Sequence, residues 1–244
     1  PLNYWDVNIN GTINLLKNMD KYNCRNLIFS SSATVYGETN QPPFKESFKL
    51  DPISPYANNK ACVEKFLEDI FYSQEDKWNI VNLRYFNPIG AHYSGIIGEN
   101  PLGKPNNIFP ILLNASSGKD EIRIFGKDWP TYDGTCIRDY IHVEDLADGH
   151  IKALESLSLK GLNTINLGTG KGTSVLELIK TFEETNGIKI KYKFADRRKG
   201  DTAILVADNT FALNKLNWKP KRNLSDMCKD GYNWISRNPN GYDD

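Results

Sequence analysis

A tyrosine and a lysine four residues apart are the first candidates for chemistry in this 244-residue sequence. Tyr56 and Lys60 fall within an expected helix, so both side chains would project from one face. A nearby ammonium group lowers the pKa of a phenol, whose ordinary value is about 10. The pair could therefore accept a proton near neutral pH. The structural alternative is a solvated helix face, where this spacing also occurs.

Small hydroxyl residues precede this pair at positions 30–34, with the sequence SSSAT. They follow an apolar stretch, residues 25–29, that is typical of a buried strand. The carboxyl ends of parallel strands are where open α/β sheets bind ligands. A hydroxyl there could hydrogen-bond a reacting oxygen, and a serine-rich turn is the structural alternative.

Helical and strand patterns alternate along the chain and supply the elements that would position these residues. Apolar spacing predicts helices at 11–19, 55–72 and 145–157, and further strands at 79–85 and 122–125. Pro55 suits a first helical turn. This alternation favours an α/β fold, a doubly wound parallel sheet, with a Pro- and Gly-rich excursion at 88–107 toward a second lobe.

Composition excludes several classes of function. Thirty basic and thirty acidic side chains cancel, so we expect neither nucleic acid nor a membrane surface as a partner. Apolar runs are too short for a membrane span, and the first residues lack a signal-peptide pattern, so we expect a cytoplasmic protein. The four cysteines form no Cys-x-x-Cys pair, which predicts reduced thiols and no metal.

The order of motifs resembles the extended short-chain dehydrogenase/reductases, and most closely their UDP-galactose 4-epimerases. The matching segments are NINGT (8–12), FSSSATVYGE (29–38), SPYANNK (54–60), LRYFNPIGAHYSG (83–95), PNNIFP (105–110), IFGKDWPTYDGTCIRDYIHVEDLADGH (124–150), INLGTGKGTSV (165–175) and RRKGD (197–201). They cover essentially the whole chain.

That resemblance implies a role for each candidate. Tyr56 would be the catalytic base, Lys60 would lower its pKa and hold the nicotinamide ribose, and Ser32 would hydrogen-bond the sugar oxygen. The cofactor-binding residues implied are Tyr56, Lys60, Tyr85, Phe86 and Asn8. The substrate-binding residues implied are Ser32, Ala33, Thr34, Asn87, Asn107, Ile108, Ile124, Phe125, Arg138, Arg198, Asp201 and Leu205.

The chemistry of the implied substrate residues is consistent with a nucleotide-sugar. Arg138 and Arg198 offer forked donors suited to a diphosphate, and Asp201 could accept from sugar hydroxyls. A buried ion pair is the structural alternative for each arginine. Leu205 stands where, in the family, residue volume controls access of N-acetylated sugars, so we expect UDP-galactose and UDP-glucose to be preferred.

Two other patterns give weaker evidence for a functional site. Gly168, Gly170 and Gly172 lie between an expected strand and helix, but their spacing is not that of a dinucleotide loop, and we interpret them as a structural turn. His92, His142 and His150 are isolated in sequence, and we interpret them as structural or surface residues.

The resemblance also implies how the chain is organised. Residues 1–95 would form the C-terminal part of a Rossmann-like NAD-binding domain. Residues 96–244 would form mainly a smaller substrate-binding lobe, with 139–170 returning to the sheet. No glycine-rich dinucleotide loop follows an early strand, so we expect an N-terminally truncated sequence that would bind NAD poorly and could be inactive alone.

The function implied is interconversion of UDP-galactose and UDP-glucose by transient NAD-dependent oxidation at sugar C4. The expected cofactor is NAD, the expected ligand a UDP-sugar, and the complete enzyme a homodimer. One alternative is a nucleotide-sugar 4,6-dehydratase, which needs an acid/base pair where Ser32 and Ala33 stand. The other is a catalytically silent nucleotide-sugar-binding fragment.

Overall fold

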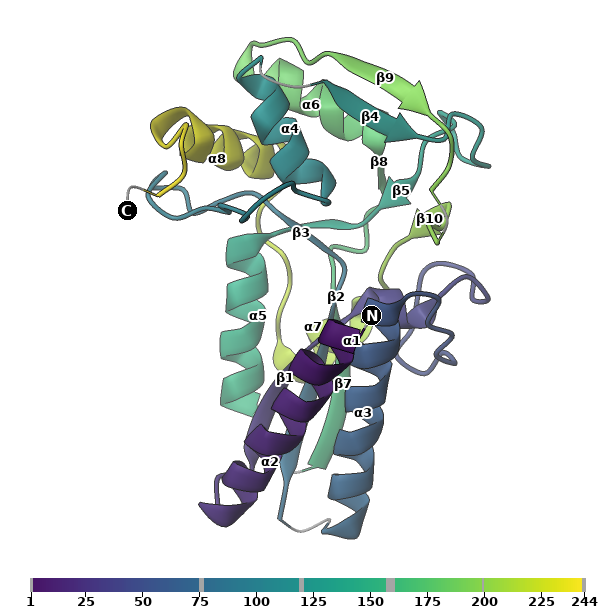
Figure 1. Cartoon of the computed structure of the whole chain (residues 1–244), viewed down its shortest axis with the longest axis vertical. Helices are drawn as coiled ribbons and strands as arrows, with labels where there is room; N and C mark the ends of the chain where they lie inside the picture. Colours follow the sequence, from purple (N-terminus) through teal and green to yellow (C-terminus); the bar gives the residue numbers. More distant parts are fainter. Residues whose placement is uncertain (1, 75–76, 119–120, 157–160, 199, 243–244) are drawn as a thin grey trace. The chain divides into compact units, whose positions relative to one another are not determined.

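The computed structural model of the chain describes residues 2–74, 77–118, 121–156, 161–198 and 200–242. The chain divides into two compact units, and Figure 1 labels their elements. The first unit comprises Pro1–Phe86, Asp148–Leu167 and Ala207–Lys219. The second comprises Asn87–Ala147, Gly168–Val206 and Pro220–Asp244. The chain therefore enters each unit three times.

A parallel sheet of three strands organises the first unit, in the order β1 (Asn26–Ser32), β2 (Asn79–Tyr85) and β7 (Gly161–Leu167). The register pairs Ser32 with Tyr85 and Tyr85 with Leu167, so the three carboxyl ends are level. The fold class expected from the sequence, α/β with a parallel sheet, is confirmed. Side chains that follow these strand ends therefore share one edge of the sheet.

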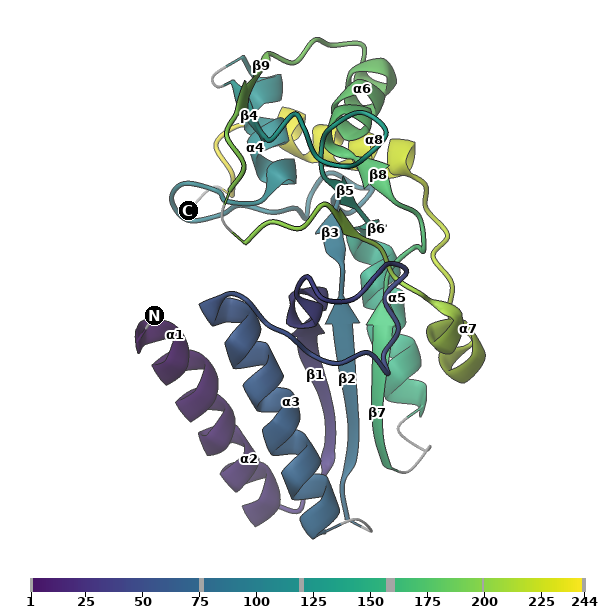
Figure 2. The same ribbon diagram turned by 90° about the vertical axis from the view of Figure 1, so that its right-hand side faces the viewer.

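Two long helical segments run side by side next to this sheet (Figure 2). The first is made of α1 (Leu2–Trp5), a π-helical turn (Asp6–Asn10) and α2 (Gly11–Lys21). The second is α3 (Pro55–Ser73). Leu16 from α2 and Leu67 from α3 pack in one buried cluster with Trp78 and Ile80. This apolar layer fixes α3 against β1 and β2, and with it the face that carries Tyr56 and Lys60.

The remaining elements of the first unit are short, apart from one helix that crosses between the units. A 3-10 turn, Ala33–Tyr36, follows β1 directly, and α7 spans Thr210–Leu216. Helix α5, Val143–Glu155, begins in the second unit and ends in the first. It was expected at 145–157, and position 157 lies outside the described residues.

Short strands and helices build the second unit, which also contains the start of α5. The elements are β3 (Asn87–Ile89) with β6 (Tyr140–His142), β4 (Ile122–Phe125) with β9 (Tyr192–Ala195), β10 (Ile204–Leu205) with β5 (Ile137–Arg138) and β8 (Thr173–Ser174), and the helices α4 (Ile108–Ser116), α6 (Val175–Asn186) and α8 (Leu224–Arg237).

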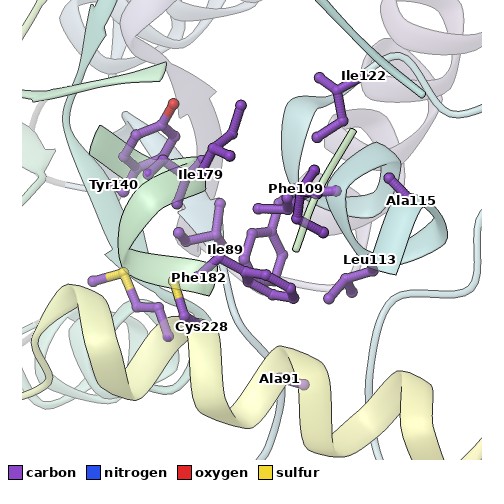
Figure 3. Close-up of a cluster of buried hydrophobic side chains, with 14 of the residues drawn as sticks. Ile89, Ala91, Phe109, Leu113, Ala115, Ile122, Tyr140, Ile179, Phe182 and Cys228 are labelled. Carbon is purple, nitrogen blue, oxygen red and sulfur yellow. The ribbon is translucent and has the colours of Figure 1, made fainter. Parts of the chain in front are cut away.

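An apolar core joins these helices (Figure 3). The rings of Phe109 from α4 and Phe182 from α6 meet edge to face, with centroids 6.3 Å apart. Cys228 and Trp234 from α8 close the cluster. This core is separate from that of the sheet and supports β4 through Ile122 and Ile124.

The boundaries between the units differ from those expected. The first unit ends at Phe86 rather than at residue 95, and its sheet is rejoined by Asp148–Leu167 rather than by all of 139–170. It also includes Ala207–Lys219, where Phe44 bridges to Ala207. Across the described residues, no helix combines the length and the apolar character needed to cross a bilayer.

Candidate active site

Tyr56 lies in the first turn of α3, and local sequence explains why the helix begins there. Ser54 is the N-cap, and its hydroxyl accepts from the backbone N–H of Ala57 at 3.2 Å. Pro55 occupies the first helical position, where its missing N–H costs no intrahelical hydrogen bond. The phenol of Tyr56 is thus presented at the helix start, with 39% of the residue exposed.

Lys60 connects the helix to the end of β1. Its ammonium group donates to the backbone carbonyl of Ser30 at 2.8 Å and lies 5.6 Å from the ring centroid of Tyr56. Partial burial lowers the pKa of Lys60. The structure thus brings the expected pair together on one helix face, beside the serine run.

The pKa of Tyr56 is raised, and burial is the main cause. A hydrogen bond with Ser32 acts in the opposite direction, and the nearby Tyr4 adds to the rise. The expected lowering by Lys60 does not dominate here. The phenol is therefore neutral at pH 7, and a further positive charge would be needed to make it a base.

Ser32 ends β1 and caps the following 3-10 turn. Its hydroxyl accepts from the backbone N–H of Thr34 at 3.3 Å and lies 2.9 Å from the Thr34 hydroxyl. Thr34 is exposed, whereas Ala33 is 1% exposed and offers no accessible side chain. Gly37 closes the turn at φ +64°, where a Cβ would approach the Asp51 carbonyl oxygen to 1.8 Å, so the turn requires glycine.

Tyr85 ends β2, and its hydroxyl joins two partners. It donates to the Ser30 hydroxyl at 2.7 Å and contacts Nε2 of His150. Phe86 follows Tyr85 and is 7% exposed. Its backbone N–H donates to the Leu167 carbonyl at 3.3 Å, and its contact with the cofactor stays a prediction.

A cavity of about 200 Å³ lies beside Lys60. Its lining shows whether polar groups are available there for part of a dinucleotide. Asn8, Asn59 and Lys60 contribute polar groups to its lining. The Asn8 amide donates to Asn59 Oδ1 at 3.2 Å, and among the described residues Asn59 Nδ2 has no partner. An ammonium group has three donors and the Ser30 carbonyl takes one. The remaining ammonium donors of Lys60 would suit the ribose hydroxyls of NAD, whereas Asn59 is 0% exposed.

In the second unit, two arginines converge on one carboxylate. Arg198 Nε lies 3.3 Å from Asp201 Oδ2, and Arg138 Nη2 lies 3.9 Å from Asp201 Oδ1. Arg198 also stacks on the ring of Phe125 at 4.2 Å. Arg138 is held by the carbonyls of Ile137 and Thr202 at 2.9 and 2.8 Å. The arrangement offers forked cationic donors beside an aromatic face.

The other expected substrate residues vary in accessibility. Leu205 is 8% exposed and pairs in register with Arg138. Ile124 is 1% exposed and belongs to the core. Asn107 is exposed at the start of α4 without a capping side-chain bond, and Ile108 follows it. Asn87 is half-buried, and among the described residues its Oδ1 has no partner.

The glycine turn after β7 binds a carboxylate of its own chain. The backbone N–H groups of Thr169 and Gly170 donate to the buried Asp139 at 2.7 and 2.9 Å. Those donors would otherwise be the ones available to a phosphate. The interpretation of this segment as a structural turn is consistent with these contacts.

The three histidines, which are isolated in sequence, have partners in the structure. His142 is fully buried, its Nδ1 accepts from the N–H of Glu144 at 3.0 Å, and Nε2 lies 3.3 Å from Asp230. Ligand-type atoms of His142, Glu144 and Asp230 lie within 4.8 Å of one another. However, both imidazole nitrogens are engaged, and Arg222 lies 2.6 Å from Glu144. We interpret this cluster as a buried ion-pair network.

Sequence patterns did not single out Glu64 or Arg84, and they gave His150 no role at the site, yet all three contact the strand ends that carry it. Glu64 lies four residues after Lys60 and eight after Tyr56, so its position on the same helix face was available as a signal. No local signal could have paired Arg84 or His150 with partners far away in the chain.

Known proteins match almost the whole chain. The family model described as GDP-mannose 4,6 dehydratase matches residues 1–231. A UDP-glucose 4-epimerase of Bacillus subtilis is 48% identical over 99% of the chain and 72% of its own length. A UDP-glucose 4-epimerase of Dictyostelium discoideum is 49% identical over 100% of the chain and 72% of its own length.

Solved structures agree in fold. The UDP-glucose 4-epimerase of Stenotrophomonas maltophila, with bound NAD and formylated UDP-arabinopyranose, has a TM-score of 0.94 and 45% identity, covering 97% of this chain and 72% of that one. The enzyme of Bifidobacterium longum, in complex with NAD+ and UDP, has a TM-score of 0.95 and 43% identity, covering 99% and 72%. The chain therefore belongs to the extended short-chain dehydrogenase/reductase family, in the branch that contains the UDP-glucose 4-epimerases.

Proposed function

We propose that this chain carries the catalytic residues of an NAD-dependent epimerase that interconverts UDP-glucose and UDP-galactose at sugar C4. The observation that carries the proposal is the meeting of Tyr56, Lys60 and Ser32 at the carboxyl end of β1, in a chain so similar to UDP-glucose 4-epimerases. NAD is the cofactor, and when bound it would accept the hydride from C4 of the sugar.

Tyr56 is the proton acceptor in this scheme. As the C4–H bond breaks and its hydride leaves, the Tyr56 phenolate takes the 4-hydroxyl proton, which gives a 4-keto sugar. Ser32 donates to the same sugar oxygen. After the ketone turns in the site, hydride returns to its opposite face and Tyr56 returns the proton. The sum is inversion at C4 with no net oxidation.

Lys60 holds the cofactor, and its positive charge contributes to stabilising the Tyr56 phenolate. Its unused ammonium hydrogens face the cavity lined by Asn8 and Asn59 and suit the two ribose hydroxyls. Burial alone leaves Tyr56 protonated at pH 7. The positive nicotinamide ring of NAD would add the missing stabilisation of the phenolate. The base is thereby active only when oxidised cofactor is bound.

The second unit is the substrate-binding lobe in this proposal. Arg138 and Arg198 bind the diphosphate of the UDP-sugar, and Asp201 keeps the two guanidinium groups oriented and accepts from a hydroxyl. Phe125, under Arg198, offers a ring face to the uracil. Leu205, next to Arg138 in the paired strands, limits the space around the sugar.

A nucleotide-sugar 4,6-dehydratase is the second candidate, because the matching family model carries that description. Dehydration needs a side-chain acid/base pair near C5 and C6 in addition to the tyrosine. Residues 32–34 provide Ser32, the buried Ala33 and Thr34 in that neighbourhood, and none is a carboxylate. These residue types favour epimerisation.

We further infer a homodimer in the cytoplasm. The helical segment α1–α2 exposes Leu2, Val7 and Leu15 at 85, 63 and 53%, which is an apolar surface suited to a second copy. All four cysteines are free, as in reducing compartments. Sedimentation at several concentrations measures the assembly, and a monomer at every concentration would contradict it.

Incubation of an active enzyme containing this chain with UDP-galactose and NAD tests the proposed reaction. An epimerase produces UDP-glucose with unchanged mass and no net NADH. A dehydratase produces a 4-keto-6-deoxy sugar that is lighter by one water. Nucleotide-sugar binding without either product would contradict both reactions and support the catalytically silent alternative.

A further inference from the structure

Glu64 shares a helix face with the two candidate catalytic residues but lies deeper. Tyr56, Lys60 and Glu64 are spaced by four residues along α3, so their side chains follow one another along a single face. Tyr56 is 39% exposed, whereas Glu64 is 6% exposed. A carboxylate in such a position requires specific partners, because burying an unpaired charge is strongly unfavourable.

Those partners are the immediate neighbours of the candidate catalytic residues on the sheet. The Ser31 hydroxyl donates to Glu64 Oε1 at 2.5 Å, and Ser31 precedes Ser32. Arg84 donates to the same carboxylate twice, from Nε at 3.0 Å and from Nη2 at 2.6 Å, and Arg84 precedes Tyr85. Glu64 thus ties α3 to the last residues of both β1 and β2.

The network continues to the third strand. Arg84 Nη1 donates to the Tyr36 hydroxyl at 3.0 Å and to the Glu46 carbonyl at 3.1 Å. The Tyr36 hydroxyl donates to Asn166 of β7 at 2.7 Å. Tyr36 and Asn166 are both 0% exposed. The network therefore connects α3 to the ends of all three strands of the sheet.

A buried ion network is by itself weak evidence for a contribution to stability. Burial opposes the charge of Arg84, but its hydrogen bonds with Glu64 and Tyr36 outweigh that effect and raise its pKa. Replacing a buried ion pair by well-packed apolar residues is often neutral or stabilising. Stability alone therefore does not account for a bidentate pair at this place.

We propose that Glu64 is a positioning residue that, through Ser31 and Arg84, sets the distances from Tyr56 and Lys60 to Ser32 and Tyr85. The proposal rests on the proposed epimerase function. The Glu64–Arg84 pair acts as a spacer between the helix and the strand ends. Proton transfer from the sugar requires the Tyr56 phenol and the Ser32 hydroxyl to meet at one sugar oxygen. A shift of about 1 Å can cost on the order of 10²-fold in rate.

The test separates positioning from stability by comparing a broken pair with a replaced pair. In active holoenzyme containing this chain, Glu64→Gln leaves Arg84 without its counter-charge. The double variant Glu64→Leu with Arg84→Met removes both charges and fills the space. Each is assayed for kcat and KM with UDP-galactose, and for Tm, at a temperature well below every transition.

We expect kcat to fall by about 10- to 100-fold in both variants, with KM for UDP-galactose changed by less than about threefold, because the candidate diphosphate ligands lie in the other unit. We expect Tm to fall in Glu64→Gln and to recover in the double variant. Recovery of Tm without recovery of kcat is the signature that a purely structural ion pair would not produce.

Asp145→Asn provides a matched control. Asp145 is also a buried carboxylate paired with an arginine, at 2.6 Å from Arg222, but both residues belong to the second unit. Its variant should lose Tm and retain kcat. If the double variant fails to fold, Ser31→Ala, which removes a single hydroxyl, should still lower kcat with little change in Tm.

Wild-type kcat in the double variant, or in Ser31→Ala, would overturn the proposal, as would a change confined to KM. These outcomes differ from failure of the proposed function. In that case the wild-type holoenzyme itself would show no conversion of UDP-galactose to UDP-glucose.

Discussion

At the scale of single residues, the decisive quantity is the pKa of Tyr56. Burial raises it, the Ser32 hydrogen bond lowers it, and Lys60 is engaged by the Ser30 carbonyl. Tyr56 therefore needs an additional positive charge nearby before its phenol can lose a proton and act as a base. For this reason, a Tyr and a Lys at this spacing do not by themselves predict a catalytic base. The serine turn and a cofactor site beside them are also needed.

The pH dependence of catalysis should reveal the contribution of Ser32. The phenolate is the reactive form, so kcat rises as the pH increases through the Tyr56 pKa. Ser32→Ala removes a hydrogen bond that lowers this pKa, so the rising limb should move to higher pH. We expect kcat at pH 7 to fall about 10²-fold, as for loss of one donor to a developing oxyanion.

Ser32→Thr keeps the hydroxyl and serves as the control for that experiment. It should retain the position of the rising limb in a profile of kcat against pH. An unshifted limb in Ser32→Ala would show that Ser32 does not act on Tyr56.

Leu205 should govern the tolerance for N-acetylated sugars. It is 8% exposed and pairs with Arg138. Leu205→Ala should raise kcat/KM for UDP-N-acetylgalactosamine relative to UDP-galactose by about tenfold, the lower end of what a methylene group contributes in an apolar pocket. A van der Waals clash can be relieved by truncation.

The neighbouring Ile204→Ala is the control, because adjacent residues of a strand point to opposite faces. Its ratio of kcat/KM values should be that of the wild type. If the ratio is also unchanged in Leu205→Ala, Leu205 does not line the sugar pocket.

At the scale of elements, apolar patterns predict the bounds of helices and strands well, but they do not predict strand ends made of polar residues. Helix α3 and strands β2 and β4 lie within one residue of their expected bounds. Strand β1, however, continues to Ser32 instead of ending at residue 29. Its polar end is stabilised by Lys60, Glu64 and Tyr85 from other elements, and a local pattern cannot contain those partners.

The same reason limits prediction of the site. Tyr56, Lys60 and Ser32 could be recognised because their motifs are local in sequence. Glu64 with Arg84 and Tyr85 with His150 are contacts over 20 and 65 residues. Such pairs depend on the register of β1, β2 and β7, which only the folded sheet specifies.

The N-cap of α3 offers a test at this scale. Ser54→Ala removes the hydroxyl that accepts from Ala57 and should lower the free energy of unfolding by ~1 kcal/mol. Ser54→Thr keeps a capping oxygen and should lose less. Denaturant titration of both variants measures the difference, and equal stability of Ser54→Ala and wild type would show that this cap contributes nothing.

At the scale of the whole molecule, chemistry is divided between two units with separate cores. We propose that the unit with the parallel sheet binds NAD and supplies Tyr56, Lys60 and Ser32. We propose that the unit with Arg138, Arg198 and Asp201 binds the UDP-sugar. The account thus predicts that substrate binding and proton transfer can be lost independently.

Comparing kcat with substrate affinity in Tyr56→Phe tests this central claim most directly. The variant removes only the hydroxyl, so the ring still packs beside Tyr4. In active holoenzyme containing this chain, we predict that conversion of UDP-galactose to UDP-glucose falls by at least about 10³-fold. Calorimetry should show a Kd for UDP-galactose within about threefold of the wild type. Turnover by Tyr56→Phe close to that of the wild type would contradict the assignment of Tyr56 as the base.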